Sequence, residues 1–292
     1  MRVFLNGRFV EESEAAISFD DRGFLFGDAV YEVIHLYDGV PYRLEAHLDR
    51  LERSLDGVML PPVDRGLLTR TIENLAAHEG QEVPDAMIYI EISRGASPRS
   101  HQFPDPAVPP TILVWCRPAP SWPDDRYAKG ISVITLSDDR WAKCWIKTVN
   151  LLPNVLAKEK ARRAGADDAL FVRDGMVLES TASNLFIVTG NTLRTAPVTN
   201  YILPGVTRAS LVELAPTVGL EVKEEPFSVE TLKAADEVFL SATGLEVLPI
   251  TVVDGVRLRD GRGPAALKLR AVLREDVRRE VAAARGDGGQ IG

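Results

Sequence analysis

Lys147 has the most distinctive surroundings of the lysines in this sequence. Only eight of the 34 basic residues are lysine, and most of them stand among polar residues. Lys147 instead follows Cys-Trp-Ile and precedes Thr-Val-Asn-Leu-Leu. An amine held among apolar side chains has a lowered pKa and can form a Schiff base with a carbonyl cofactor. The same pattern is also typical of a strand-end lysine whose stem packs while its ammonium reaches water.

Glu179 is a carboxylate at the end of an expected strand. The hydroxyl-rich turn Ser-Thr-Ala-Ser follows it, and another apolar stretch begins at Asn184. A carboxylate buried at this point needs a cationic partner, and a protonated pyridine nitrogen is one such partner. The alternative is a glutamate that only caps the turn.

Two short segments have the residue types that bind an anion. Leu203-Pro-Gly-Val-Thr207-Arg opens an expected helix, whose first N–H groups and dipole attract negative charge. Ser241-Ala-Thr243-Gly follows an apolar strand and adds possible donors. Ordinary capping explains the first segment equally well, and a plain strand exit explains the second. Neither segment matches a P-loop, and no Gly-x-Gly-x-x-Gly occurs, which argues against nucleotide binding.

Arg99 and His101 stand two residues apart in a loop rich in Ser and Pro. In an extended loop they point to the same side, where they could bind a carboxylate together. A solvated loop is the alternative. Tyr31 lies in an expected strand and either projects its phenol into a site or packs on the core. Arg50 lies off the apolar stripe of its helix, so the periodicity predicts a solvated arginine.

The elements that must position these residues are hairpins and amphipathic helices. Asn-Gly or Asp-Gly turns begin at Asn6, Asp38, Asp174 and Asp254. The expected strands span residues 3–5, 8–10, 31–37, 40–43, 87–92, 111–115, 131–136, 169–173, 176–178, 184–188 and 237–240. Helices are expected over 44–58, 65–77 and 154–164, after Pro204-Gly205, and at the end of the chain, where Leu269, Leu273, Val277 and Val281 are spaced by four.

The pattern predicts two α+β domains rather than a doubly wound sheet, because hairpins dominate and no regular βαβ alternation occurs. Three prolines within residues 117–125 interrupt regular structure, so we place the boundary near residue 120. We expect a small N-terminal domain over 1–120, a larger C-terminal domain over 121–285 and a disordered tail over 286–292.

Composition excludes several classes of protein. The net charge is 34 − 42 = −8, which disfavours nonspecific binding of nucleic acid. No apolar run approaches a membrane span, and no signal-peptide core follows the start. The four histidines are scattered, so we expect no metal site. Two cysteines, Cys116 and Cys144, are expected as free thiols in the cytoplasm.

Taken in order, from about residue 1 to residue 257, these segments resemble the fold-type IV pyridoxal-phosphate enzymes, the class IV aminotransferases. The matching pieces are Arg22-Gly-Phe-Leu-Phe-Gly-Asp-Ala-Val-Tyr-Glu-Val, His47-Leu-Asp-Arg-Leu, Ile146-Lys-Thr-Val-Asn-Leu-Leu-Pro-Asn, Glu179-Ser-Thr-Ala-Ser-Asn-Leu-Phe and Leu203-Pro-Gly-Val-Thr-Arg. Within the class, Arg99-Ser-His-Gln-Phe-Pro is similar to the carboxylate-binding loop of the D-amino acid aminotransferases.

The resemblance implies a role for each residue. Lys147 is the Schiff-base lysine and moves the proton between Cα and C4′, and Glu179 pairs with the pyridine nitrogen. The phosphate is held by Arg50, Thr207, Thr243 and the Val206 amide, while Leu203 packs against the ring. Tyr31 binds the substrate carboxylate with Arg99 and His101 of the partner subunit. The resemblance therefore implies a homodimer with pyridoxal 5′-phosphate at the domain interface.

Four positions depart from the family pattern. Trp145 stands where Asp commonly precedes Ile-Lys, and Ser180 replaces a usual Gly. Ala182 and Ala242 replace usual serines near the cofactor and therefore lose possible hydrogen bonds. These changes bear on the tuning of the cofactor.

The activity implied is transfer of the amino group of a D-amino acid, of the D-alanine or D-glutamate type, to pyruvate or 2-oxoglutarate by a ping-pong mechanism. The alternatives are an L-branched-chain or (R)-amine transaminase, an aminodeoxychorismate lyase, and a noncatalytic dimeric binding protein on the same fold. Lys147 and Glu179 in register argue against the last of these.

Overall fold

The computed structural model describes residues 1–78, 83, 85–120, 124–258 and 263–286. The chain forms two compact units. Unit 1 comprises Met1–Pro120, Ile146–Asn150 and Arg279–Gly292, and unit 2 comprises Ser121–Trp145 and Leu151–Arg278. Both units combine helices with antiparallel hairpins, which confirms the predicted α+β class.

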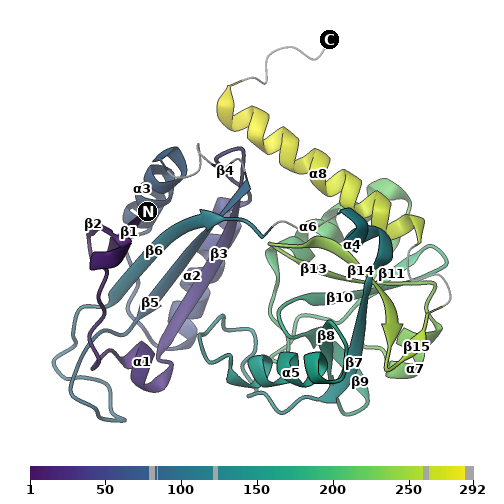
Figure 1. Cartoon of the computed structure of the whole chain (residues 1–292), viewed down its shortest axis with the longest axis horizontal. Helices are drawn as coiled ribbons and strands as arrows, with labels where there is room; N and C mark the ends of the chain where they lie inside the picture. The colour runs from purple at the N-terminus through teal and green to yellow at the C-terminus, as the bar shows by residue number, and fades with distance from the viewer. Residues whose placement is uncertain (79–82, 84, 121–123, 259–262, 287–292) are drawn as a thin grey trace. The chain divides into compact units, whose positions relative to one another are not determined.

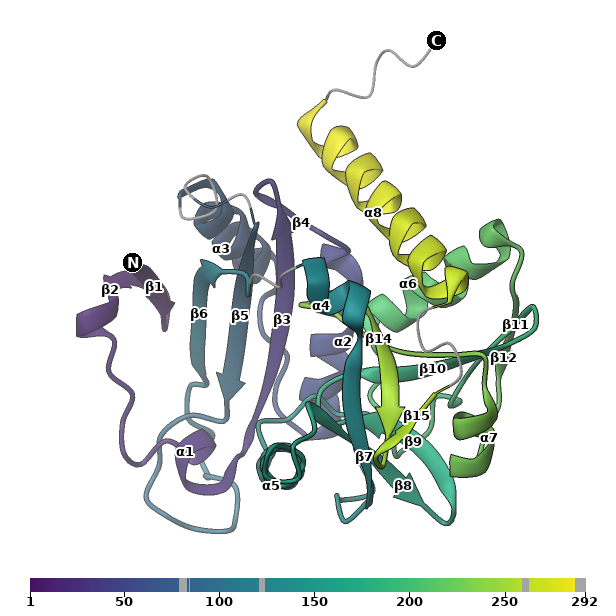
Figure 2. The same ribbon diagram turned by 45° about the vertical axis from the view of Figure 1, so that its right-hand side comes forward.

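Unit 1 contains a six-stranded sheet in the order β2-β1-β6-β5-β3-β4. The strands β3, β5 and β6 lie side by side in Figure 2. Its elements are β1 (Arg2–Leu5), β2 (Arg8–Glu11), η1 (Glu12–Glu14), α1 (Arg22–Phe26), β3 (Ala29–Tyr37), β4 (Val40–Pro41), α2 (Leu44–Gly57), α3 (Arg65–His78), β5 (Asp85–Ser93) and β6 (Thr111–Pro118). The hairpin turns match the prediction: Asn6 and Gly7 have φ of 50° and 92°, as a type I′ turn requires.

Helix α2 packs on strand β3 and carries one of the predicted site residues, Arg50. The inward side of β3 consists of Glu32, Ile34 and Leu36, all fully buried. The facing side of α2 buries Leu48, Leu51 and Leu55, as the periodicity predicts. His47, Arg50 and Ser54 are buried there as well. The buried face of α2 is therefore broader and more polar than its apolar stripe.

Unit 2 is built on a nine-stranded sheet, part of which closes on itself. The order is β12-β11-β10-β13-β14-β7-β8-β9, β15 pairs with β14, and β9 also pairs with β10. The strands are β7 (Ile131–Ser137), β8 (Asp168–Arg173), β9 (Met176–Ser180), β10 (Asn184–Thr189), β11 (Thr192–Thr195), β12 (Glu221–Glu224), β13 (Glu237–Ala242), β14 (Glu246–Val253) and β15 (Val256–Arg257). Strands β10, β13, β14, β7, β8 and β9 thus form a closed ring.

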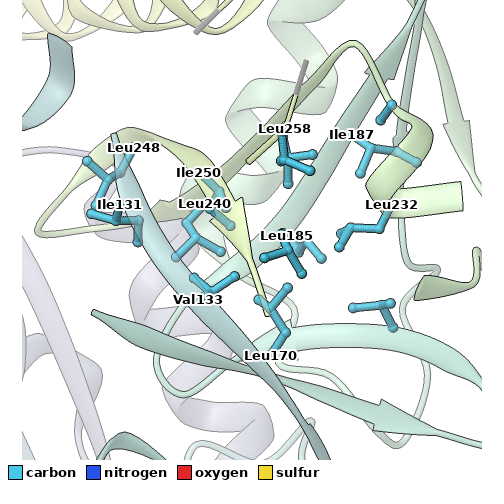
Figure 3. Close-up of a cluster of buried hydrophobic side chains, with 14 of the residues drawn as sticks. Ile131, Val133, Leu170, Leu185, Ile187, Leu232, Leu240, Leu248, Ile250 and Leu258 are labelled. Atoms are coloured by element: carbon cyan, nitrogen blue, oxygen red, sulfur yellow. The ribbon is translucent and has the colours of Figure 1, made fainter. Parts of the chain in front are cut away.

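Apolar side chains fill the interior of this ring (Figure 3). Val133, Leu170, Leu185, Leu240 and Ile250 come from five different strands and are all buried. The neighbours of Leu170 on β8, Ala169 and Phe171, point to the other face, because side chains alternate along a strand. Both faces of β8 are therefore buried, and its residues 169–172 are all apolar.

Helices cover the outside of unit 2 (Figure 1). They are α4 (Asp124–Lys129), α5 (Leu152–Arg163), α6 (Val206–Leu214), η2 (Ala215–Val218), α7 (Val229–Ala234) and α8 (Pro264–Arg285), whose last residues belong to unit 1. The alanines Ala157 and Ala161 of α5 pack against β8. None of the helices in the described ranges is long and apolar enough to cross a membrane.

The structure differs from the sequence expectations in two places. The predicted domains are continuous, and residues 146–150 were assigned to the C-terminal one. In the structure Ile146–Asn150 belongs to unit 1, because Thr148 pairs with Val30 of β3. The prolines of 117–125 interrupt less than expected, since β6 extends to Pro118 and α4 begins at Asp124. Of the predicted disordered tail, only Gly286 lies within the described residues.

Candidate active site

Lys147 lies against the start of strand β3, in unit 1. Its carbonyl oxygen accepts the N–H of Tyr31 at 2.9 Å, and its own N–H donates to Ser54 Oγ of α2 at 3.1 Å. The ammonium Nζ is 4.1 Å from the centroid of the Tyr31 ring. The lysine is half-buried, and its backbone is fixed from both the strand and the helix.

Tyr31 is therefore a neighbour of Lys147. Its ring also stacks on Tyr89, with 5.6 Å between centroids. Among the described residues, the ring of Tyr31 contacts Tyr89 and Lys147, and neither Arg99 nor His101 is one of its partners. The structure thus brings together two of the predicted site residues, the amine and the phenol.

Arg50 is buried rather than solvated, which corrects the periodicity interpretation. Its Nε and Nη2 donate to the two carboxylate oxygens of Glu32 at 2.7 and 2.9 Å. Glu32 also contacts His47 Nδ1 at 2.8 Å. Burial alone raises the pKa of Glu32, but the charge and hydrogen bonds of Arg50, together with His47, outweigh it and lower the pKa.

Glu32 was missed by sequence reasoning. It is next to Tyr31 on β3 and therefore points to the opposite face, toward α2. A signal was available, since a carboxylate among Val-Tyr and Val-Ile in a strand is rarely buried unpaired. Its partner comes from another element, so periodicity could not identify Arg50 as that partner.

Arg99 and His101 are exposed side chains on the loop between β5 and β6. Both lie beside the ring of Phe26 from α1. The guanidinium carbon of Arg99 is 5.3 Å from the Phe26 centroid, and the His101 ring centroid is 5.7 Å away. The two side chains therefore approach the same aromatic ring.

Glu179 is buried at the end of β9 in unit 2, where β9 pairs with β10. Its Oε1 accepts Arg140 Nη1 at 2.6 Å, while its Oε2 accepts Asn184 Nδ2 and the Leu203 N–H, each at 3.1 Å. Burial raises the pKa of Glu179 to about 7, although Arg140 and the Leu203 N–H lower it.

Arg140 was also missed by sequence reasoning. Its guanidinium binds Asp138 as well as Glu179, and Nη2 donates to the Tyr201 carbonyl at 3.0 Å. Because Arg140 is shared between two carboxylates, it compensates Glu179 only in part. The run Asp-Asp-Arg after an apolar strand is the signal that could have identified it.

The predicted anion-binding segment opens helix α6, close to Glu179. Gly205 is the N-cap residue, and no side chain caps the helix. The first N–H groups, at Val206 and Thr207, have no intrahelical acceptor by the geometry of a helix start. A Cβ on Gly205 would lie 2.1 Å from Asn184 Oδ1, so the close approach to β10 requires glycine.

Thr243 and Ser241 lie at the end of β13, and Ser241 is the register partner of Asn184. Thr243 is half-buried. Ser241 Oγ is buried and has no hydrogen-bond partner among the described residues. An unpaired hydroxyl, a carboxylate with a raised pKa and an uncapped helix start occur together in unit 2.

These groups fit pyridoxal phosphate. Glu179 can accept a hydrogen bond from a protonated ring nitrogen, the start of α6 can receive a phosphate, and Lys147 supplies a primary amine. In the described part of the chain, no group of three or more His, Cys, Asp or Glu residues is placed to hold a metal ion.

Comparisons with known proteins agree with this chemistry. The model of the protein family described as "Amino-transferase class IV" matches residues 29–253. A D-alanine aminotransferase of Staphylococcus epidermidis is 40% identical over 266 residues, covering 89% of this chain and 92% of the relative.

Two solved structures share the fold over almost the whole chain. A branched-chain amino acid aminotransferase from Escherichia coli has a TM-score of 0.83 and 27% identity, covering 94% of this chain and 92% of that one. A hypothetical aminotransferase from Mycobacterium tuberculosis in a PLP-bound form has a TM-score of 0.82 and 27% identity, covering 94% of this chain and 98% of that one. The chain belongs to the class IV aminotransferase family and is a pyridoxal-phosphate-dependent enzyme.

Proposed function

We propose that this aminotransferase takes its amino group from a D-amino acid, of the D-alanine or D-glutamate type. The acceptor is a 2-oxo acid such as pyruvate or 2-oxoglutarate, and the mechanism is ping-pong. The observation that carries the proposal is the pair Arg99 and His101, gathered beside Phe26 on one loop. The Staphylococcus epidermidis relative at 40% identity, named a D-alanine aminotransferase, supports the same donor.

Lys147 is the proposed catalytic residue. When bound, pyridoxal phosphate supplies an aldehyde for the amine and a protonated ring that withdraws electrons from the substrate Cα. Lys147 Nζ would hold the cofactor through its aldehyde and would move the proton to and from the substrate Cα. Tyr31, in contact with Nζ, and Ser54, bonded to the Lys147 backbone, restrict where that amine can reach.

Glu179 is proposed to hold the pyridine nitrogen in its protonated form. An ionised carboxylate in this buried place gains a cationic partner when the ring binds, which lowers its pKa from about 7. Asn184 and the Leu203 N–H keep Oε2 oriented, and Arg140 keeps Oε1 oriented. Leu203 is proposed to pack against the ring.

The phosphate is proposed to bind the N–H groups of Val206 and Thr207, the Thr207 and Thr243 hydroxyls, and Arg50. The start of α6 favours a dianion through its N–H groups and dipole. Glu32 keeps the Arg50 side chain in one orientation through two hydrogen bonds.

A homodimer completes the proposal, with Tyr31 binding the substrate carboxylate together with the partner subunit's Arg99 and His101. Helix α5 supports a second copy, because Leu152, Val155 and Leu156 are exposed while its alanines face the core. Cys116 and Cys144, both within the described residues, are not joined in a disulfide, which supports the proposed cytoplasmic location.

The experiment is a half-reaction without acceptor. The purified enzyme, loaded with pyridoxal phosphate, is mixed with D-alanine, D-glutamate, L-leucine or (R)-1-phenylethylamine, and the visible band of the cofactor is followed. We expect the band to be lost with the D-amino acids alone. Loss only with L-leucine or the amine would replace the proposal with the branched-chain or (R)-amine alternative. Pyruvate released from aminodeoxychorismate without an oxo acid would instead indicate the lyase.

A further inference from the structure

The loop between β5 and β6 carries Arg99 and His101 on an irregular backbone, so something must hold it in place. Arg22, at the start of α1, holds the loop by donating hydrogen bonds to backbone carbonyl oxygens of the loop. Its Nη1 donates to the carbonyl oxygens of Ser100 at 2.7 Å and of Gln102 at 3.2 Å. These two carbonyls flank His101 in the sequence, and one guanidinium therefore fixes the backbone on both sides of it.

Arg22 is itself held rigidly. It is only 3% exposed, and its Nε donates to Asp28 at 2.9 Å. Asp28 also accepts Nε and Nη2 of Arg94, at 2.8 and 3.0 Å. Burial raises the pKa of Asp28, but the hydrogen bonds and charges of Arg94 and Arg22 outweigh this and lower it. The aspartate thus stays ionised and anchors both arginines.

Two aromatic rings complete this cluster of Arg22, Phe26, Arg94 and Phe103, which we name the arginine clamp. The Arg22 guanidinium carbon is 4.8 Å from the Phe26 centroid, on the ring that Arg99 and His101 also approach. The Arg94 guanidinium carbon is 3.6 Å from the centroid of Phe103, a residue of the same loop. Charge–ring contacts of this kind are individually modest and act together here.

We infer that Arg22 is a positioning residue for substrate recognition, acting through the loop that presents Arg99 and His101. The inference rests on the proposed function of those two residues. Arg22 is buried and contacts the loop through the carbonyl oxygens of Ser100 and Gln102. Two long exposed side chains bind a carboxylate well only when their backbone is ordered beforehand, because otherwise binding must supply the ordering free energy. The clamp therefore contributes to affinity for the carboxylate rather than to the chemical step.

The test compares Arg22→Lys with Arg117→Lys in the holoenzyme. Lysine keeps the charge but cannot bind Asp28 and two carbonyls in one plane. Arg117 is a matched control, since it is an exposed arginine of unit 1 that pairs with Glu12. We expect Arg22→Lys to raise KM for D-alanine and for pyruvate, and the inhibition constant of propionate, about tenfold, with kcat changed less than about threefold. Arg117→Lys should leave all of these values unchanged.

The same substitution in a second variant separates a positioning role of Arg22 from a general loss of structure. In Arg99→Ala/His101→Ala enzyme the loop has nothing left to position, so adding Arg22→Lys should leave KM unchanged. An equal tenfold rise in both backgrounds would overturn the inference, and so would an unchanged KM in Arg22→Lys alone. Failure of the proposed function is distinguishable, because Arg99→Ala itself would then leave D-alanine turnover intact.

A protein-level readout covers the case in which Arg22→Lys folds poorly. Phe26→Leu removes the ring between Arg22, Arg99 and His101 without touching an ion pair. Trypsin cleavage after Arg99, followed by mass spectrometry of the holoenzyme, should be several-fold faster in either variant than in wild type. Equal cleavage rates with a normal melting temperature would contradict the inference.

Discussion

Glu32 of unit 1 and Glu179 of unit 2 are both buried carboxylates beside an arginine, yet their pKa values shift in opposite directions. Arg50 gives Glu32 two hydrogen bonds, and His47 contacts it as well. Arg140 gives Glu179 one hydrogen bond at 2.6 Å and is shared with Asp138, whose charge further raises the pKa of Glu179.

The difference shows that burial alone does not decide the state of a carboxylate. Two hydrogen bonds from the Arg50 guanidinium and the contact with His47 keep Glu32 ionised, and the same two bonds orient Arg50. Glu179 is short of positive charge within its own unit. A protonated ring nitrogen would supply the missing charge, which supports the proposed pairing of Glu179, rather than Glu32, with the cofactor.

The largest expected effect tests the chemistry while leaving both carboxylates intact. Lys147→Ala removes the amine, so we expect transamination to fall at least about 10⁴-fold. Steady-state rates with D-alanine and pyruvate measure this effect. Lys143→Ala, an exposed lysine four residues earlier, is the control and should keep its activity. A Lys147→Ala enzyme that retains a tenth of wild-type activity would remove Lys147 from the mechanism.

Glu32→Gln removes the negative charge from the buried cluster of Glu32, Arg50 and His47. It leaves Arg50 buried without its ionised partner, so we expect the free energy of unfolding to fall by about 3–5 kcal/mol. Urea denaturation of the cofactor-free protein measures the loss. An effect below about 1 kcal/mol would show that Arg50 is compensated by other groups and that the comparison between the two clusters is wrong.

Glu179→Gln tests the partly compensated carboxylate through pH. The folded pKa of about 7 exceeds the ordinary value of 4.5. Between these values the folded state binds more protons than the unfolded state, so the free energy of unfolding falls as pH rises. The contribution is complete below pH 4.5 and is lost above about pH 7, a change of about 3 kcal/mol.

The measurement compares cofactor-free wild type with Glu179→Gln by urea denaturation at several pH values. The two curves should converge at low pH and separate as pH rises, with wild type losing more stability. Adding pyridoxal phosphate to wild type should weaken this pH dependence, because the ring nitrogen pairs with the carboxylate. Parallel curves for the two proteins would refute the raised pKa.

The smallest expected effect concerns the hydrogen bond between the Lys147 backbone and Ser54 of α2, the helix that also carries Arg50. Ser54→Ala removes the acceptor of the Lys147 N–H, so we expect a loss of about 1 kcal/mol in stability. The pH dependence assigned to Glu179 should be unchanged, since the substituted side chain belongs to unit 1. Thermal unfolding measures the first effect, and the same denaturation series measures the second.

Much of the fold could be predicted because its signals are local. The turns at Asn6, Asp38, Asp174 and Asp254 all have the expected positive φ, since two adjacent residues decide a type I′ turn. Helices α2 and α3 were predicted nearly to their ends. Helix α1 was missed, because five residues are too few to show a period.

The candidate site could be predicted only in part. Lys147 and Glu179 stood out by their surroundings, but their roles came from a resemblance to a family. The prediction that Arg50 is solvated was wrong, because its partner Glu32 lies 18 residues away in the sequence, on another element. Arg22 stood out only as part of a motif, and its contact with the loop could not be predicted, because the two acceptors lie 78 and 80 residues further along the chain.

The sequence by itself therefore determined the hairpins, the amphipathic helices, the α+β class and the family, all of which depend on near neighbours or on ordered motifs. Only the tertiary structure decided that Arg50 is buried, that Glu32 is ionised, that Glu179 has a raised pKa and that Arg22 holds the loop of Arg99 and His101. The physical reason is that desolvation and charge depend on which groups are close in space, and here those groups come from different elements.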